Sequence, residues 1–335
     1  MTEPILPPLR WLSANDVVAA MPPVETRLAL AERTMVALAT PGGFEMPPKL
    51  ALHPRPAASF IHAMPAMLRG SDLFGDLLGM KWVAGFATNI EIGLPGISAL
   101  FILNDPATGI PIAMMDGGPI TAQRTAAVSG LALQRFGPPV SGRPVRSALI
   151  GAGGQGRSHL PVFGHVIPGV ALHLYDPDPR RAEALADEAR ATLGIGSVVV
   201  ETSPRAAIRD ADVVLTAASF GPAEDRQAMT NEWLAPGATV IPIDYATYCA
   251  AEVAEQASLF LVDQREQYLA NRDAGNFDNY PDPDATLGEA ILASTPRPEG
   301  RVVVTHLGVG LSDVVFGEAI LRSAVQQGLG IELPR

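Results

Sequence analysis

The sequence predicts an α/β protein of two domains, and three observations lead to this prediction. The chain has 335 residues, 47% of them hydrophobic and 18% charged, which is typical of a globular protein with more than one core. From residue 141 onward, short apolar runs alternate with helical stretches, the pattern of a Rossmann-type parallel sheet. The first 140 residues instead carry helical segments followed by longer strand-like runs, as in an α+β domain.

A linker rich in proline and glycine, GPPVSGRP, separates these two patterns. We therefore predict a first domain over residues 1–140 and a Rossmann-type domain over residues 141–310. Residues 311–335 form one more amphipathic helical segment beyond the last Rossmann-type strand. We expect this C-terminal helix to return to the first domain and complete it.

Helices in the first domain are predicted for SANDVVAAM, with Ser13 as N-cap, and for VETRLALAERTMVALAT, ended by Gly42 and Gly43. Strand-like runs follow at residues 58–68, 79–89, 97–105 and 110–118, and then a helix at 121–137. In the second domain, the predicted strands are 145–151, 170–176, 197–202, 210–219, 237–244, 257–263 and 300–308. Helices are expected at 154–166 and at 178–194, where Gly194 serves as the residue after the C-cap.

Composition excludes several classes of function. The formal net charge of −11 argues against nucleic acid as a partner, since phosphate binding needs clustered Lys and Arg. The first 13 residues lack the pattern of a signal peptide, and no apolar run is long enough to cross a membrane. The single cysteine, Cys249, allows no internal disulfide and fits a reducing compartment. We expect a cytoplasmic protein, and we assign no metal ligand.

A glycine-rich turn lies between the first predicted strand and helix of the second domain. Gly151, Gly153 and Gly156 give the spacing G-x-G-x-x-G, in which the glycines permit a tight turn and a close approach to a pyrophosphate. The amides at the helix N-terminus then face the phosphate charge. Asp176 ends the next strand, where an acidic residue binds the adenosine ribose. The cofactor-binding residues predicted here are Gly151, Gly153, Gly154, Gln155, Gly156 and Asp176.

Asp176 favours NAD over NADP, because a carboxylate repels a 2′-phosphate. Arg180 and Arg181 follow closely and offer a route to NADP binding, with Arg181 assigned to the cofactor site. Both arginines are equally compatible with ordinary solvated charges on a helix. NAD is therefore the expected cofactor, with NADP as the alternative.

Several motifs give the chain a resemblance to a known family. They are MPPK, HAMPA, KWV, GLP, LNDPATGIP, MDG, TAQRTAAVS, IGAGGQG and HLGVGLSDV, in that order along the chain. This set closely resembles the ornithine cyclodeaminase/μ-crystallin family. The resemblance implies that the first domain binds the substrate and forms a homodimer. It also implies an NAD(P)-dependent enzyme acting on a small amino, imino or 2-oxo acid.

The resemblance assigns three basic residues to the substrate carboxylate. Lys81 is the lysine of KWV, Arg124 is the arginine of TAQRT, and Lys49 stands where the family commonly has arginine. Arginine offers a two-pronged donor to a carboxylate, and lysine adds a point charge. Arg124 and Thr125 are also assigned to the cofactor side of the site.

Asp244 matches the catalytic aspartate of the family, and Lys81 is assigned with it to catalysis. Asp244 ends a predicted strand, and the carboxyl ends of parallel strands line the ligand crevice. A carboxylate there can take a proton from the substrate amine and return it in the reverse reaction. The alternative is an aspartate that only caps the next turn.

Two departures from the family put ornithine in doubt. His62 stands where the cyclodeaminases place a glutamate that holds the distal amine, and Gly96 stands in place of a threonine. His62 remains a candidate substrate-binding residue. Asp313 belongs to the G-x-x-x-D motif of the family, and we interpret it as a helix N-cap. We interpret residues 265–284 as a mobile surface loop, with a loop at the pocket edge as the alternative. His306 and Cys249 are interpreted as buried side chains without a role in the reaction.

Three functions remain open. The first is an amino-acid dehydrogenase or imine reductase acting at the Cα–N bond. The second is an ornithine cyclodeaminase that recycles its NAD. The third is a μ-crystallin-like protein that binds a small molecule without catalysis. Retention of Lys81, Arg124 and Asp244 together favours catalysis.

Overall fold

A computed structural model describes residues 6–55, 59–70, 75–219 and 225–335 of the chain. The chain divides into two compact units, which are Met1–Arg124 with Val309–Arg335 and Thr125–Gly308. The division falls inside helix α3 (Gly117–Phe136), upstream of the linker at residues 137–144. The α/β class predicted from the sequence is confirmed.

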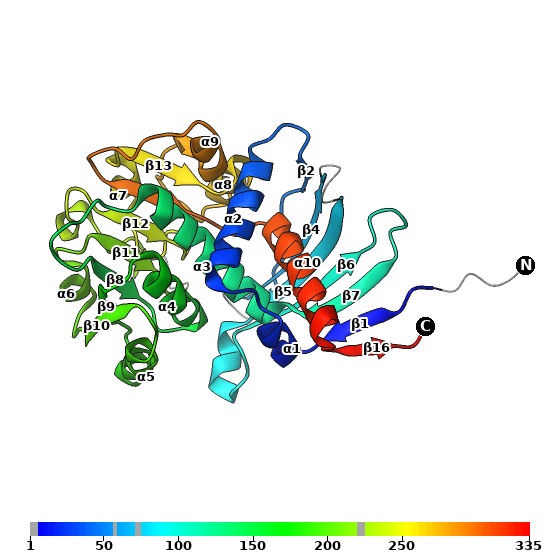
Figure 1. Ribbon diagram of the computed structural model, residues 1–335. Coiled ribbons are helices and arrows are strands. Elements are labelled where there is room, and N and C mark those ends of the chain that lie inside the picture. The colour runs from blue at the N-terminus through cyan, green and yellow to red at the C-terminus, as the bar shows by residue number, and fades with distance from the viewer. Residues whose placement is uncertain (1–5, 56–58, 71–74, 220–224) are drawn as a thin grey trace, which may run out of the picture. The chain divides into compact units, whose positions relative to one another are not determined.

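The first unit is built on a mixed sheet with the strand order β16-β1-β7-β6-β5-β4-β2, and β3 pairs with β4 (Figure 1). Strands β1 and β7 are parallel, and the other neighbours are antiparallel. The strands are β1 Leu9–Leu12, β2 Phe44–Glu45, β3 Leu50–Leu52, β4 Phe60–Leu68, β5 Leu77–Gly85, β6 Ile97–Asn104, β7 Pro111–Asp116 and β16 Ile331–Leu333.

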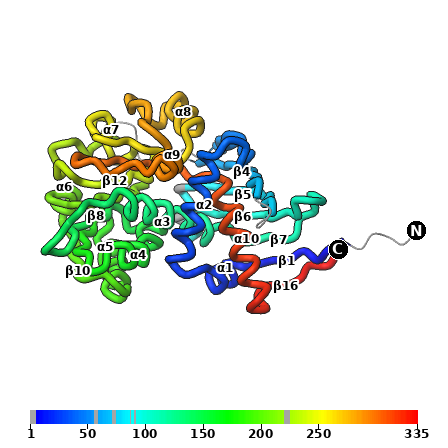
Figure 2. The backbone as a smooth tube through the Cα atoms, turned by 45° about the horizontal axis from the view of Figure 1, so that its top comes forward, coloured from blue at the N-terminus to red at the C-terminus, as the bar shows by residue number. Residues whose placement is uncertain are grey.

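One face of this sheet is covered by helix α10 (Gly310–Gln327), and α2 (Val24–Leu38) lies beside α10 (Figures 1 and 2). The cross-strand partners Met64, Lys81, Phe101, Met115 and Leu12 form a row on the covered face, and all five are buried. Two glycines let the helix approach closely. A Cβ atom on Gly317 would lie 2.2 Å from the Phe101 ring, and one on Gly310 would lie 2.8 Å from the carbonyl oxygen of Met64. The C-terminal helix therefore completes the first unit.

The remaining helices of the first unit are α1 (Ala14–Ala19) and the 3-10 helix η1 (Ala87–Ile92). Ser13 is the N-cap of α1 and forms a capping box with Asp16, as its position in the sequence predicts. Helix α2 ends at Leu38, before the two glycines that were expected to end it. The chain forms a turn there instead, in which the Gly43 amide donates to the Thr40 carbonyl.

The second unit is a parallel sheet with the order β10-β9-β8-β11-β12-β15-β13-β14. The first five strands of this order form a doubly wound half, with its reversal between β8 and β11. The strands are β8 Arg146–Ile150, β9 Val170–Tyr175, β10 Ile195–Val200, β11 Val213–Thr216, β12 Thr239–Pro242, β13 Leu259–Val262, β14 Ala285–Thr286 and β15 Val302–Thr305. The helices are α4 Gly154–Val166, α5 Pro179–Arg190, α6 Pro204–Ile208, η3 Asn231–Trp233, α7 Ala251–Glu255, α8 Arg265–Asp273 and α9 Leu287–Leu292.

Two expectations for this unit are wrong. Helix α5 ends at Arg190, so Gly194 is not its capping glycine. Gly194 has φ of 88° and packs against Gly164, where a Cβ would lie 2.1 Å from the carbonyl oxygen. Residues 265–284 are not a loose surface loop, because they contain α8 and the buried rings of Tyr268, Phe277 and Tyr280 in the core of the unit.

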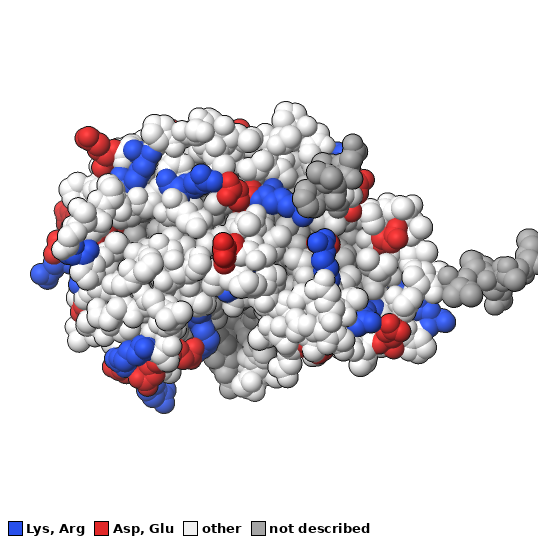
Figure 3. Space-filling view, in the orientation of Figure 1, with Lys and Arg blue, Asp and Glu red and all other residues white. Residues whose placement is uncertain are grey.

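Lysine and arginine side chains are interspersed with aspartate and glutamate on the face shown in Figure 3. Among the described residues on that face, the basic side chains form no continuous patch. Among the helices that the structure describes, none is long and apolar enough to cross a membrane.

Candidate active site

The glycine-rich turn connects β8 to α4. Gly151 has φ of 104°, and a Cβ there would lie 2.4 Å from the Ala217 carbonyl oxygen. A Cβ on Gly156 would lie 2.3 Å from the Gly151 carbonyl oxygen. Both positions therefore require glycine. Gly153 is the N-cap of α4 and brings no capping side chain, while the Cβ position of Gly154 is open, so the first amides of the helix are available to an anion.

Asp176 follows β9 and lies against this turn with 7% of its surface exposed. Its Oδ2 accepts from the Ala152 amide at 2.7 Å, and its Oδ1 accepts from the Asp178 amide at 2.9 Å. Each carboxylate oxygen has a second lone pair for a ribose hydroxyl. Asp176 therefore also stabilises the turn on which the cofactor site depends.

The two arginines after Asp176 lie in different surroundings. Arg180 pairs with Asp178 and its side chain is 93% exposed. One terminal nitrogen of Arg181 lies 3.4 Å from the position that a Cβ on Gly153 would occupy. Arg181 is therefore the arginine placed at the glycine-rich turn.

Asp244 comes two residues after β12, at the carboxyl edge of the parallel sheet. It is 7% exposed, and its Oδ2 accepts from the Ala218 amide at 3.2 Å. Its Oδ1 is buried and has no partner at hydrogen-bond geometry in the described part of the chain. Burial raises the pKa of Asp244 to about 6, although the Thr216 hydroxyl and the Ala218 amide act in the opposite direction. Such a carboxylate can gain and lose a proton near neutral pH.

The turn after Asp244 is conformationally unusual. Tyr245 and Ala246 have φ of 54° and 57°, so two successive residues other than glycine adopt the left-handed conformation. The Thr247 amide donates to the Asp244 carbonyl at 3.0 Å, and the Tyr245 hydroxyl donates to the Leu307 carbonyl at 3.1 Å. These bonds hold the backbone of Asp244 against the end of β15. Strain of this kind concentrates at functional sites.

The first unit contains a buried cluster of three charged side chains. Lys81 on β5 is 1% exposed, and its Nζ lies 2.8 Å from Oδ2 of Asp313 on α10. The Nε of Arg124 on α3 lies 3.3 Å from Oδ1 of the same carboxylate. Burial lowers the pKa of Lys81 to about 7, and the charge of Asp313 opposes this shift. Two of the predicted carboxylate-binding residues thus share one buried anion.

Asp313 was not recognised as part of the site from the sequence. The N-cap of α10 is Val309, so the interpretation of Asp313 as the helix N-cap is wrong. The signal in the sequence was an aspartate among apolar residues on the buried side of a helix, where a charge requires a partner.

His62 and Lys49 lie on the β3–β4 side of this cluster. His62 is on β4, next to Ala51 of β3 in the sheet, and its ring stacks on Phe60 with centroids 4.6 Å apart. Burial lowers the pKa of His62 to about 4, and the positive charges of Lys49 and Lys81 lower it further. Lys49 is half-buried just before β3. His62 is therefore neutral at physiological pH.

The other predicted residues are also accounted for. Thr125 is buried on α3, directly after Arg124. His306 and Cys249 are buried as expected, with His306 Nε2 at 2.9 Å from the Ser129 hydroxyl. Burial raises the pKa of Cys249 to about 12, so it is an inert thiol. Across residues 6–55, 59–70, 75–219 and 225–335, no three His, Cys, Asp or Glu side chains gather to hold a metal.

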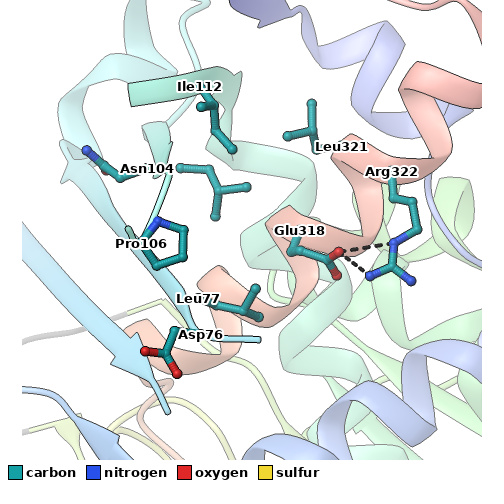
Figure 4. A pocket seen from close by; sticks show the side chains of 9 residues that line it. Asp76, Leu77, Asn104, Pro106, Ile112, Glu318, Leu321 and Arg322 are labelled. Atoms are coloured by element: carbon teal, nitrogen blue, oxygen red, sulfur yellow. Dashed lines mark hydrogen bonds and ion pairs between the residues drawn. The ribbon is translucent and has the colours of Figure 1, made fainter. Parts of the chain in front are cut away.

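The first unit contains a hollow of about 200 Å³ (Figure 4). Leu77, Leu103 and Leu321 line it, together with the ion pair between Glu318 and Arg322. It contains none of the residues predicted for the site.

Fold and site together define a two-unit α/β protein with a dinucleotide-type turn and a separate cationic cluster. Residues 13–325 match the profile of the Ornithine cyclodeaminase/mu-crystallin family, and the chain belongs to this family. The resemblance found in the sequence motifs is thereby confirmed.

Two named relatives match the chain over most of its length. The chain is 33% identical to the nodulation efficiency protein NfeD of Rhizobium meliloti, over 97% of this chain and 98% of the relative. It is 28% identical to the ketimine reductase mu-crystallin of Mus musculus, over 90% and 91% of the two chains.

Two solved structures share the fold. The Δ1-pyrroline-2-carboxylate reductase of Thermococcus litoralis, in complex with NADH and L-proline, superimposes with a TM-score of 0.83 at 23% identity. It covers 97% of this chain and 100% of its own. An archaeal alanine dehydrogenase dimer with bound NAD has a TM-score of 0.82 at 24% identity and covers 98% and 99% of the two chains.

Proposed function

We propose that this protein is an NAD(P)-dependent oxidoreductase acting on the Cα–N bond of a small 2-amino or 2-imino acid. The observation that carries the proposal is Asp244, a buried carboxylate with one oxygen free of hydrogen bonds within the described chain and a pKa of about 6. It lies at the carboxyl edge of a dinucleotide-type sheet, where a proton-transfer group belongs. A protein that only bound a small molecule would not need such a group.

The glycine-rich turn fits a dinucleotide, because its open backbone amides and close glycine contacts match a pyrophosphate. Gly151, Gly153, Gly154, Gln155 and Gly156 would hold the pyrophosphate, Asp176 the ribose, and Arg181 would add positive charge. We infer NAD as the cofactor from the carboxylate of Asp176. When bound, its nicotinamide supplies or accepts the hydride at the substrate Cα.

Lys81 and Arg124 would bind the α-carboxylate, with Lys49 adding positive charge. In the oxidative direction the substrate amine gives a proton to Asp244, and Cα gives up a hydride, which leaves the C=N bond of an imine. In the reductive direction protonated Asp244 returns the proton to nitrogen. Asp244 holds this proton at one of its two carboxylate oxygens.

His62 argues against a substrate with a distal ammonium group. A neutral imidazole is a modest acceptor, and a protonated one repels ammonium. We therefore favour imine reduction or amino-acid oxidation over ornithine cyclodeamination as the function. Cyclodeamination remains the second candidate because the family includes it, and cofactor-dependent binding without catalysis is the third.

We also propose a homodimer formed through the sheet of the first unit. The face opposite α10 carries Trp82 beside Ala63 and Leu100, and Trp82 and Leu100 are 39% and 41% exposed. Met80, Ile102 and Pro65 form the next row of the same apolar face. A second copy of the chain would cover it. Light scattering should give the mass of a dimer at micromolar concentration, and a monomer would contradict this proposal.

The function is tested by following NADH oxidation with a panel of 2-oxo acids plus ammonia or methylamine, and with cyclic imines. Ornithine and lysine are assayed in parallel for release of ammonia. Net NADH consumption that is lost in Asp244→Asn supports the reductase. Release of ammonia from ornithine to give proline, without net change in NADH, would make the cyclodeaminase correct instead.

A further inference from the structure

Asp313 is the one member of the charged cluster in the first unit to which no role has been given. It is fully buried, and its two oxygens engage different cations, Lys81 at 2.8 Å and Arg124 at 3.3 Å. The three side chains come from β5, α3 and α10. A carboxylate buried between two elements of the fold is costly unless both of its oxygens are paired.

Each cation uses only some of its donors in this arrangement. Lys81 approaches Asp313 and the Thr121 hydroxyl, the latter at 3.3 Å, which leaves one of its three N–H groups. Arg124 gives its Nε to Asp313, and no hydrogen bond from its terminal nitrogens is found among the residues that the structure describes. Donors of both cations thus remain for a ligand.

We propose that Asp313 is a positioning residue of the substrate carboxylate site, which holds Lys81 and Arg124 together and leaves one excess positive charge between them. This inference rests on the proposed function. Without Asp313 the two cations repel each other in a desolvated setting, and they lose the anchor that fixes them to α10. With Asp313 in place, the carboxylate of one bound substrate molecule neutralises the excess positive charge of the cluster.

The protonation state of Lys81 supports this role. The charges that act on Lys81 come from Asp313, Arg124 and Lys49. The charge of Lys81 in turn lowers the pKa of His62. Asp313 alone raises the pKa of Lys81, whereas burial, Arg124 and Lys49 lower it. Removing Asp313 would therefore shift the pKa of Lys81 below its value of about 7, so that the lysine loses its charge at a lower pH than in the wild type.

The experiment compares the wild type with Asp313→Asn, which keeps the shape and removes the charge. Ser312→Ala is the matched control, because Ser312 is buried in the same turn and its hydroxyl has no partner within the described residues. The Lys81 side chain is titrated by NMR of ¹³C-labelled lysine, assigned with Lys81→Arg. NADH binding by fluorescence checks that each variant is folded.

We expect a lower Lys81 pKa in Asp313→Asn, unchanged in Ser312→Ala. The KM of the best acid from the substrate panel should rise roughly tenfold to a hundredfold in Asp313→Asn at about pH 6.5, where Lys81 of the wild type is mostly charged, with a smaller change in kcat. Adding L-proline as a carboxylate probe should raise the Lys81 pKa of the wild type.

An unchanged Lys81 pKa in Asp313→Asn, or a lower KM, would overturn the proposal. A lower KM would mean that Asp313 competes with the substrate carboxylate instead of preparing its site. If the wild type turned over no acid of the panel, the proposed function would fail. The NMR titration would still decide whether Asp313 keeps Lys81 charged.

Discussion

The two units bury ionisable groups in opposite ways. In the first unit Lys81, Arg124 and Asp313 are paired, so each buried charge has a partner within 3.3 Å. In the second unit Asp244 is buried without a cation at salt-bridge distance in the described chain, and one of its oxygens accepts no hydrogen bond there. Paired charges are suited to holding a ligand, whereas an isolated carboxylate is suited to exchanging a proton.

This difference follows from what each element of the fold supplies. Lys81 forms an ion pair with Asp313 of helix α10. Gly310 and Gly317 allow this helix to lie close to the sheet. Asp244 lies at a strand end and accepts from the Ala218 amide instead of pairing with a counter-ion. The comparison predicts that mutations in the first unit change binding, whereas mutations at Asp244 change turnover.

The largest effect is expected for Asp244→Asn, which cannot exchange the proton. Turnover should fall by roughly 10²–10⁴-fold, while binding of NADH and of the substrate is retained. In the wild type, imine reduction should slow as the pH rises through about 6, because Asp244 loses the proton it donates. Amino-acid oxidation should accelerate over the same range. Undiminished turnover in Asp244→Asn would contradict the role of Asp244 in proton transfer and thus the contrast between the two units.

The next largest effect is expected for Lys81→Ala and Arg124→Ala. Each should lose about 3–5 kcal/mol of transition-state binding, the cost of leaving a buried charge unpaired, or at least about a hundredfold in kcat/KM. NADH affinity should not change in Lys81→Ala, because Lys81 is assigned to the substrate alone. Arg69→Ala is the control, since its pair with Glu45 is solvent-exposed. Unchanged kcat/KM in either variant would remove that residue from the site.

A smaller effect is expected at the cofactor turn. The wild type should bind NADH more tightly than NADPH, and Asp176→Asn should shift this preference by roughly tenfold toward NADPH, because the negative charge is lost. The amide oxygen of asparagine can still accept from the Ala152 amide. Fluorescence titration with each reduced cofactor measures the shift. Tighter binding of NADPH by the wild type would transfer the specificity role to Arg181 and Arg180.

The smallest effect is expected at the turn that follows Asp244. Ala246 has a left-handed conformation, which costs a residue with a Cβ about 1–2 kcal/mol, and Ala246→Gly removes this cost. The greater conformational freedom of glycine in the unfolded chain lowers the stability of the variant by about 0.5–1 kcal/mol. Ala186→Gly, inside α5, is the control, because Ala186 is also buried and both variants lose a methyl group from the core. Ala246→Gly should therefore melt higher than Ala186→Gly. A Tm for Ala246→Gly at or below that of the control would show that this turn is not strained.

The sequence by itself determined seven strands of the second unit, the helices α4 and α5, and the position of the glycine-rich turn. These features depend on local patterns, namely apolar runs bounded by turn residues and glycines at fixed spacing. The resemblance to the family placed Lys81, Arg124 and Asp244 as candidates. The local patterns missed the short strands β1, β2, β3, β14 and β16, which carry too few residues to show a period.

Only the tertiary structure decided which charged side chains form ion pairs. Asp313 lies far from Lys81 and Arg124 along the chain, and nothing local distinguishes an aspartate that caps a helix from one that pairs across a sheet. The burial of Phe277 and Tyr280 likewise came from packing, in a segment whose composition resembles a surface loop. Long-range contacts set the burial of a side chain, and burial in turn set the pKa values of Lys81 and Asp244.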